Sequence, residues 1–106
     1  MGIFLKNMSL KGKTALITGA TKGIGRGAAE AIAESGGDII AIGRNQSELN
    51  SLEKKIKKLK VKYTSFNCDV NNYDKIKSFI TKLKKLDILV NNAGTNIPEN
   101  FLNVKE

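Results

Sequence analysis

The sequence predicts an α/β protein in which helices cover both faces of a parallel sheet, and three observations support this fold class. Short apolar runs alternate with amphipathic segments along 106 residues. The apolar runs have few polar interruptions, which is typical of parallel strands buried on both faces. The segments between them are long enough for helical crossovers, which are right-handed in nearly all proteins. A chain of this length forms one domain that buries roughly 65% of its unfolded surface.

Breakers and periodicity predict the element order β-α-β-α-β-α-β. The strands are expected at residues 14–18, 38–43, 61–68 and 86–90, and the helices at residues 24–35, 47–60 and 72–85. Gly36 and Gly37 end the first helix. Asn45 or Ser47 caps the second helix. After residue 94, Pro98 indicates a turn and Asn100 the start of another helix.

Two of the predicted helices carry an apolar stripe at helical spacing. In the second helix the stripe consists of Leu49, Leu52, Ile56 and Leu59. In the third helix it consists of Ile76, Phe79, Ile80 and Leu83. Four parallel strands with three helices are the first half of a doubly wound, Rossmann-type sheet. Its strand order is 3-2-1-4, truncated after the fourth strand, and a dinucleotide binds in the crevice where the order reverses.

The composition weighs against several function classes. The formal charge is +8, but 16 of the 18 basic residues are Lys, and aromatic residues make up 6%. Nucleic-acid readers use Arg forks and aromatic platforms. The Lys residues fall mainly in 54–62 and 75–85, between Leu and Ile at helical spacing, which indicates solvated helix faces. Polyanion binding is therefore kept only as a charge-based alternative, and no specific nucleic-acid partner is expected.

Catalysis by a thiol and metal chemistry have no support in the sequence. Cys68 is the only cysteine, and the chain contains no His. A catalytic thiol needs a partner base, so Cys68 is interpreted as a small core residue at a strand end. Without His, the usual zinc sites and Ser-His triads are excluded. The start of the chain has no apolar leader and no run is long enough to span a bilayer, so a cytoplasmic location is expected.

A glycine-rich turn follows the first predicted strand, with the sequence TGATKGIG at Thr18–Gly25. Glycines permit a tight turn and let the backbone approach a pyrophosphate at the next helix's N-terminus. Taken alone, such a turn is weak evidence. A second motif, DILVNNAG at Asp87–Gly94, follows the fourth strand. Together the two motifs resemble the short-chain dehydrogenase/reductase family, over roughly residues 10–94.

The resemblance implies a cofactor site. Gly19, Gly23 and Gly25 match the pyrophosphate turn of the family, and Thr21, Lys22 and Ile24 match its intervening positions. Asp69 matches the acid that hydrogen-bonds the adenine in this family, and Val70 is next to it. Asn92, Ala93 and Gly94 match the stretch that lies along the ribose and nicotinamide. Asn91 is expected to tie the sheet together instead. For Asp69, the alternative role of a helix N-cap or first-turn acid is kept open.

The end of the second strand predicts the cofactor. An enzyme that prefers NAD usually places an acid there, to accept from the ribose 2′-hydroxyl. Here Gly43 occupies that position and Arg44 follows, with Lys22 as a second cation. A guanidinium holds a phosphate bidentately, so NADP is predicted over NAD. The alternative is that both side chains are simply solvated.

The resemblance places the catalytic Ser, Tyr, Lys and Asn of the family after the second motif. A Y-x-x-x-K pattern does occur at Tyr73 and Lys77, but it precedes that motif and is rejected. No catalytic residue is therefore assigned, and the chain alone is expected to be inactive. We interpret residues 1–106 as the N-terminal half of an NAD(P)-binding domain. Its parts are a lead-in at 1–12, the nucleotide-binding core at 13–94, and the start of the substrate side at 95–106.

The function implied is hydride transfer between NADP(H) and a carbonyl or alcohol substrate. A non-catalytic nucleotide-binding module is the alternative, since the chain stops at Glu106 before the catalytic residues. A fragment of a longer reductase is favoured over a natural short form. By resemblance, the complete protein is expected to form a homo-oligomer and to have no membrane partner.

Overall fold

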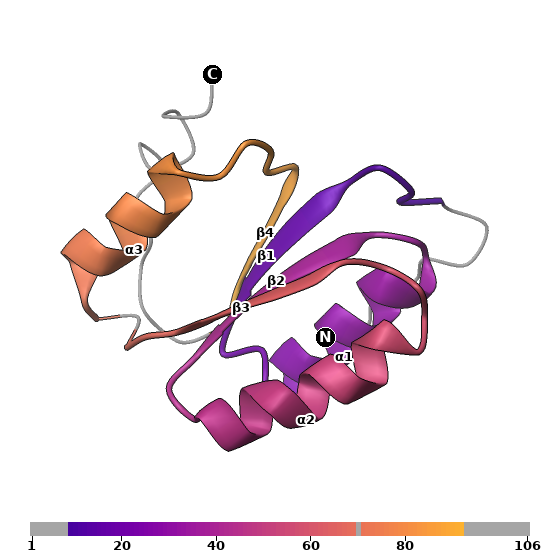
Figure 1. Ribbon diagram of the computed structural model, residues 1–106, viewed down its shortest axis with the longest axis horizontal. Coiled ribbons are helices and arrows are strands. Elements are labelled where there is room, and N and C mark those ends of the chain that lie inside the picture. The colour runs from indigo at the N-terminus through magenta and orange to yellow at the C-terminus, as the bar shows by residue number, and fades with distance from the viewer. Residues whose placement is uncertain (1–8, 70, 93–106) are drawn as a thin grey trace.

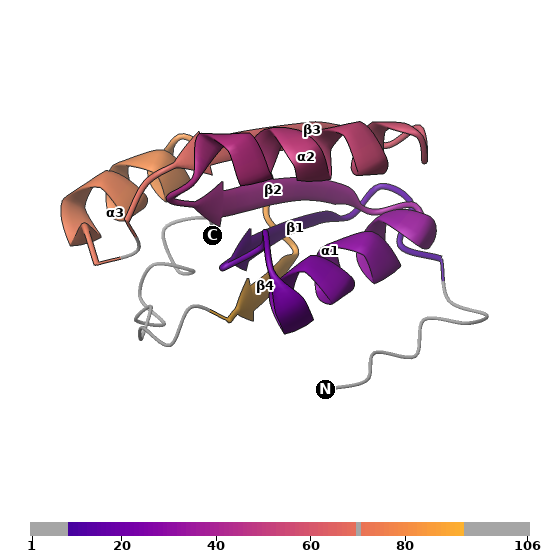
Figure 2. The same ribbon diagram turned by 90° about the horizontal axis from the view of Figure 1, so that it is seen from below.

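The structure, a computed structural model, describes residues 9–69 and 71–92. Seven elements follow one another along these residues: β1 (Thr14–Thr18), α1 (Gly23–Glu34), β2 (Asp38–Gly43), α2 (Gln46–Lys57), β3 (Tyr63–Asn67), α3 (Tyr73–Thr81) and β4 (Ile88–Asn91). All strand pairs are parallel, and the order across the described sheet is β3-β2-β1-β4, which can be followed in Figure 2. The predicted Rossmann-like α/β fold and its strand order are confirmed.

Helices cover the two faces of the sheet unequally (Figure 1). Strand residues that point to one face, such as Ile17 and Ile39, pack with buried residues of α1 and α2. The residues that alternate with them along the strands, such as Leu16 and Ile40, point to the other face and pack with Ile76 and Ile80 of α3. The strands are thus buried on both faces, which explains why their sequences are nearly continuous apolar runs.

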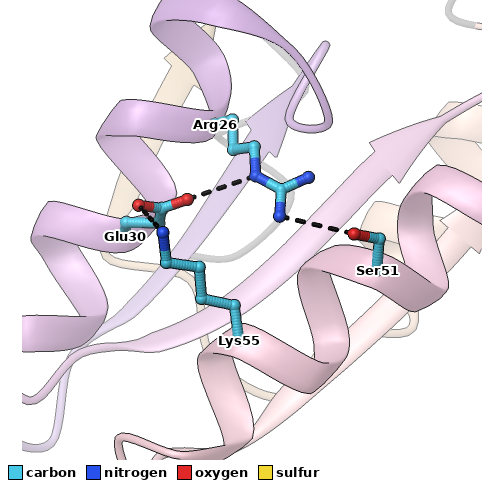
Figure 3. Close-up of polar contacts among 4 residues, drawn as sticks. All are labelled: Arg26, Glu30, Ser51 and Lys55. Atoms are coloured by element: carbon cyan, nitrogen blue, oxygen red, sulfur yellow. Dashed lines mark hydrogen bonds and ion pairs between the residues drawn. The ribbon is translucent and has the colours of Figure 1, made fainter.

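A polar network fixes α2 against α1 (Figure 3). Glu30 on α1 accepts from Arg26 Nε at 3.2 Å and pairs with Lys55 Nζ of α2 at 3.1 Å. Arg26 Nη2 also donates to Ser51 Oγ of α2 at 3.5 Å. The carboxylate and guanidinium are about three-quarters covered, so the network is better shielded from solvent than an ordinary surface pair. It joins the first half of α1 and its middle to the middle and last turn of α2.

The second helix ends earlier than its prediction of residues 47–60, since it covers Gln46–Lys57. Leu59 was expected to complete the apolar stripe of α2, and it is 38% exposed. The helix ends at Lys57, so Leu59 lies in the following turn and leaves the face on which Leu49, Leu52 and Ile56 are buried. Lys60 in the same turn has a φ of 62°, which ends the helical path. Of the two residues predicted as the cap of α2, Asn45 is the N-cap, and its side chain accepts from the backbone N–H of Glu48.

The third helix is shorter than its prediction of residues 72–85. It ends at Thr81, and Leu83 in the following segment still packs against the α3 face of the sheet. The Lys-rich segments behave as predicted, since the Lys side chains of 54–62 and 75–85 are exposed. None of the helices within residues 9–69 and 71–92 has the length and apolar content that crossing a membrane requires. The predicted turn at Pro98 and helix start at Asn100 lie outside the described residues.

Candidate functional site

A pocket with a volume of about 360 Å³ lies at the carboxyl edge of the sheet. Three connections meet there: the turn after β1, the end of β2 with the start of α2, and the loop after β3. The lining residues are Gly19, Thr21, Lys22, Ile42, Gly43, Arg44, Asn45, Glu48, Cys68, Asp69 and Asn71. In open parallel sheets, ligands bind at this edge, where the strand order reverses.

The glycine turn is as tight as its sequence predicts. Gly19 and Gly23 have φ angles of 61° and 53°, in the left-handed region that favours glycine. Gly25 is buried, and a Cβ built on it would clash with the carbonyl oxygen of Gly19 and lie 2.7 Å from Asn92 Nδ2. Any side chain at Gly25 would therefore push α1 away from the turn and from the end of β4.

The start of α1 is left open for an anion. Its N-cap residue, Lys22, makes no side-chain cap, and no acid lies in its first turn. By contrast, α2 and α3 are capped by Asn45 and Asn72, and each has an acid in its first turn. The first N–H groups of a helix need acceptors, and the helix dipole favours negative charge there. A phosphate of a nucleotide meets both requirements.

Hydrogen bonds join the turn to the end of β4. Thr18 Oγ1 donates to Asn91 Oδ1 at 3.0 Å and accepts from the backbone N–H of Asn92 at 3.0 Å. Asn92 Nδ2 donates to the carbonyl oxygen of Gly19 at 3.4 Å. Asn91 therefore ties β4 to β1 as predicted. Ile24 at the start of α1 is 50% exposed, which leaves an apolar surface beside the turn.

Arg44 and Asp69 face each other across the pocket. Arg44 Nη1 lies 3.6 Å from Asp69 Oδ2, and the two side chains are 76% and 44% exposed. The idea that Asp69 caps α3 is wrong, because Asn72 is the cap and accepts from the backbone N–H of Lys75. Asp69 Oδ1 instead accepts from Asn71 N at 2.9 Å, which shapes the loop and leaves Oδ2 toward the pocket.

Lack of space does not explain why residue 43 is a glycine. A Cβ there would meet Thr21 Cγ2 at 3.4 Å and Leu49 Cδ2 at 3.5 Å, which are ordinary contacts. An acid at this position would fit at its first carbon, so its absence is a chemical feature of the pocket.

Glu48 is the pocket residue that sequence reasoning missed. Its Oε1 accepts from Thr21 Oγ1 at 3.1 Å, and its Oε2 lies 3.4 Å from Lys22 Nζ. The carboxylate therefore crosses from α2 to the glycine turn. The spacing of Asn45 and Glu48 is that of a capping box, which could have drawn attention to the position. Nothing in that spacing indicates partners in the glycine turn.

Cys68 lies at the inner wall of the pocket and is 6% exposed, as predicted for a core residue. Burial raises the pKa of its thiol above the usual value, so the reactive thiolate is disfavoured. Within the part of the chain that the structure describes, no three His, Cys, Asp or Glu side chains gather as metal ligands would.

The predicted site residues divide into three groups. Gly19, Thr21, Lys22, Arg44 and Asp69 line the pocket. Gly23, Ile24, Gly25 and Asn92 lie next to it at the turn and at the end of β4. Val70, Ala93 and Gly94 lie outside the described residues. Tyr73 begins α3 and Lys77 is exposed further along it, on the element that follows the Asp69 loop.

A four-stranded parallel sheet in the order β3-β2-β1-β4, with helices on both faces, is a Rossmann-like α/β fold, in which ligands generally bind at the point where the strand order reverses. Sequence comparison is more specific, since the family described as short chain dehydrogenase matches residues 13–106. The chain belongs to the short-chain dehydrogenase/reductase family, whose relatives are oxidoreductases.

Known proteins similar to this chain include sugar-acid and sugar enzymes. A 2-dehydro-3-deoxy-D-gluconate 5-dehydrogenase of Pseudoalteromonas atlantica is 42% identical over 96 residues, covering 86% of this chain and 38% of that enzyme. The crystal structure of L-sorbose reductase from Gluconobacter frateurii, complexed with NADPH and L-sorbose, has a TM-score of 0.75 and 32% identity. That similarity covers 85% of this chain and 36% of the reductase.

A third similar protein has been solved in complex with NAD. Carveol dehydrogenase from Mycobacterium avium, in complex with NAD, has a TM-score of 0.74 and 28% identity, covering 91% of this chain and 43% of that one. Similar proteins thus bind NADPH or NAD. This chain spans 38% of the length of the Pseudoalteromonas enzyme.

Proposed function

We propose that the chain is the cofactor-binding part of an NADP(H)-dependent oxidoreductase that acts on a carbonyl or alcohol substrate. The observation that carries the proposal is the uncapped start of α1 behind a tight glycine turn, in a pocket that also contains Arg44 and Asp69. Its residues suit a dinucleotide, whose nicotinamide ring supplies or accepts the hydride. The chain itself binds and orients that group.

In this proposal each segment of the pocket has a separate binding role. The turn and the first N–H groups of α1 hold the pyrophosphate. Asp69, with Val70 beside it, accepts from the adenine amino group, and Asn92 lies along the ribose and nicotinamide. The full proposed set is Gly19, Thr21, Lys22, Gly23, Ile24, Gly25, Arg44, Asp69, Val70, Asn92, Ala93 and Gly94.

The preference for NADP(H) rests on the end of β2. Arg44 is 76% exposed beside the pocket, and its nearest partner, Asp69, lies 3.6 Å away, so the guanidinium is available to a ligand phosphate. Lys22, which is 79% exposed, lines the same pocket. Gly43 carries no carboxylate to repel a phosphate, although a Cβ at this position would make only ordinary contacts.

Arg44→Asp tests the proposed preference in the 106-residue chain. It should weaken NADPH binding by about 10-fold or more, because one charge-assisted hydrogen bond to the phosphate contributes about 1.5–3 kcal/mol. NADH binding should change far less. The measurement is a fluorescence titration with each cofactor, and Lys84→Asp, outside the pocket, is the control with the same change of charge. Equal losses for both cofactors would show that Arg44 does not contact the 2′-phosphate, and failure of the unmodified chain to bind either would refute the proposed function.

The proposal assigns no catalytic residue within the described part of the chain. Tyr73 and Lys77 belong to α3, which begins four residues after Asp69, at the adenine end of the proposed site. They are therefore poorly placed to protonate a substrate beside the nicotinamide. We propose residues 1–106 as one structural unit that holds the cofactor, and the 106-residue chain alone should bind it without turning over a carbonyl substrate.

A further inference from the structure

The charged groups of the pocket include one that opposes a phosphate. Glu48 lines the pocket with one carboxylate oxygen 3.4 Å from Lys22 Nζ, and its side chain is 31% exposed, whereas that of Lys22 is 79% exposed. With one oxygen on Thr21 and the other near Lys22, its carboxylate occupies two groups of the glycine turn that a nucleotide would contact.

Capping of α2 does not account for this carboxylate. In a capping box, the acid at this position reaches back to the N-cap backbone N–H. Here the Asn45 side chain accepts from Glu48 N at 3.0 Å, while the Glu48 carboxylate points across to the turn. The helix start is therefore satisfied by Asn45, and the Glu48 side chain acts between α2 and the turn.

We propose that Glu48 is a specificity-determining residue that limits the preference for NADP(H). This inference rests on the proposed function. A 2′-phosphate bound to Lys22 must share that ammonium with the carboxylate or displace it, and in either case it lies a few ångströms from a negative charge. A 2′-hydroxyl meets no such repulsion and can donate a hydrogen bond to a carboxylate. Arg44 and Lys22 thus favour the phosphate, and Glu48 reduces their advantage.

Glu48→Gln is the direct test, because it removes the charge and keeps an oxygen that Thr21 can donate to. The matched control is Glu53→Gln on the same helix, since Glu53 pairs with Lys57 and does not line the pocket. Adenosine 2′,5′-bisphosphate and 5′-AMP are suitable probes, because they carry only the part of the cofactor that this pocket would hold. Titration calorimetry on the 106-residue chain gives their dissociation constants, and NADPH and NADH are measured in the same way.

Glu48→Gln should tighten binding of adenosine 2′,5′-bisphosphate and NADPH by about 3- to 10-fold, the effect of removing one partly screened charge. Binding of 5′-AMP and NADH should stay within about 2-fold or weaken. The gain should shrink in high salt, which screens exposed charges. The gain should also be smaller in a Lys22→Gln background, because residue 22 then has no ammonium group that pairs with Glu48. Glu53→Gln should change none of these constants.

Two other outcomes are distinguishable. If the unmodified chain binds the probes and Glu48→Gln weakens the 2′-phosphorylated ones or leaves the selectivity unchanged, Glu48 only positions the turn and the inference is wrong. If the unmodified chain binds none of the four nucleotides, the proposed function fails and the inference fails with it. Circular dichroism of both variants, with the thermal midpoint, shows whether a lost affinity comes from lost folding.

Discussion

The first half of the described chain is better packed than the second. In β1 and β2 four residues of each strand are buried, whereas β3 and β4 contain half-buried and exposed residues only. α1 and α2 lie side by side over one face of the sheet, and α3 lies on the other (Figure 1). The glycine turn and the start of α2 belong to the well-packed half.

The two halves of the described chain contribute differently to the pocket. The better packed half supplies positive φ angles, the open start of α1, the close approach at Gly25 and also the charged side chains of Lys22, Arg44 and Glu48. The less packed half adds Asp69 and Asn71 on the loop after β3, and Asp69 is joined to the first half through Arg44. Local stability follows buried apolar contact, so the two halves should respond differently to the same substitution.

Matched isoleucines should show the largest contrast. Ile56 on α2 is fully buried against strands and α1, so Ile56→Ala should cost about 4 kcal/mol of unfolding free energy. Ile80 on α3 is 1% exposed, but its cluster is bordered by half-buried residues such as Phe79 and Leu86. Its cavity can relax, so Ile80→Ala should cost about 2 kcal/mol. Urea unfolding measures both, and a larger loss at Ile80 would contradict the comparison.

Two glycines of α1 should respond in opposite directions. Gly25→Ala forces a carbon against the turn, and should cost about 2–3 kcal/mol and reduce NADPH binding. Gly27, two residues along, has open space where a Cβ would lie, so Gly27→Ala should stabilise the helix by about 0.5–1 kcal/mol. Thermal unfolding and cofactor titration of both variants provide the check. Tolerance of alanine at Gly25 would mean that the turn is not held as tightly as the structure shows.

Acid should weaken a hydrogen bond that the Asp87 side chain makes next to β4, in the second half of the described chain. Asp87 Oδ2 accepts from Thr14 N at 2.9 Å, just before β4. That hydrogen bond, and then the charges of Lys85 and Lys13, lower the pKa of Asp87. A depressed folded pKa gives stability above the unfolded value of about 4, which is lost as the pH falls through the folded pKa. In the Asp87→Asn variant, stability should fall slightly less steeply as the pH is lowered. Urea unfolding midpoints between about pH 2 and 6 measure this dependence. An unchanged pH profile would show that Asp87 does not contribute to the loss of stability in acid.

The first half could be predicted from sequence more closely than the second. The predicted strands at 14–18 and 38–43 match β1 and β2, because uninterrupted apolar runs bounded by Gly leave little choice. The strand predicted at 61–68 is shorter in the structure, and β4 is shifted toward Asn91. In these segments Lys, Tyr and Asn are compatible with both strand and loop, so pairing with the neighbouring strand decides where each begins and ends.

The pocket was predicted in part, for a similar reason. Motif spacing places Gly19, Thr21 and Lys22 because the turn is local in sequence. The ion pair of Arg44 with Asp69 and the contacts of Glu48 join segments more than 20 residues apart. Such pairs depend on how β2, β3 and α1 are packed, and no periodicity in the sequence encodes them.

The most direct test of the central claim is a nuclear magnetic resonance titration of the isotope-labelled chain with adenosine 2′,5′-bisphosphate. If the pocket between the glycine turn, Arg44 and Asp69 holds the adenosine end of NADP, the largest amide shifts should fall at Gly19–Gly25, Arg44 and Asp69. The exposed Lys-rich face of α2 should shift little. Shifts concentrated at Lys54–Lys62 and abolished by moderate salt would instead indicate non-specific anion binding, and would contradict the assignment of this pocket as the cofactor site.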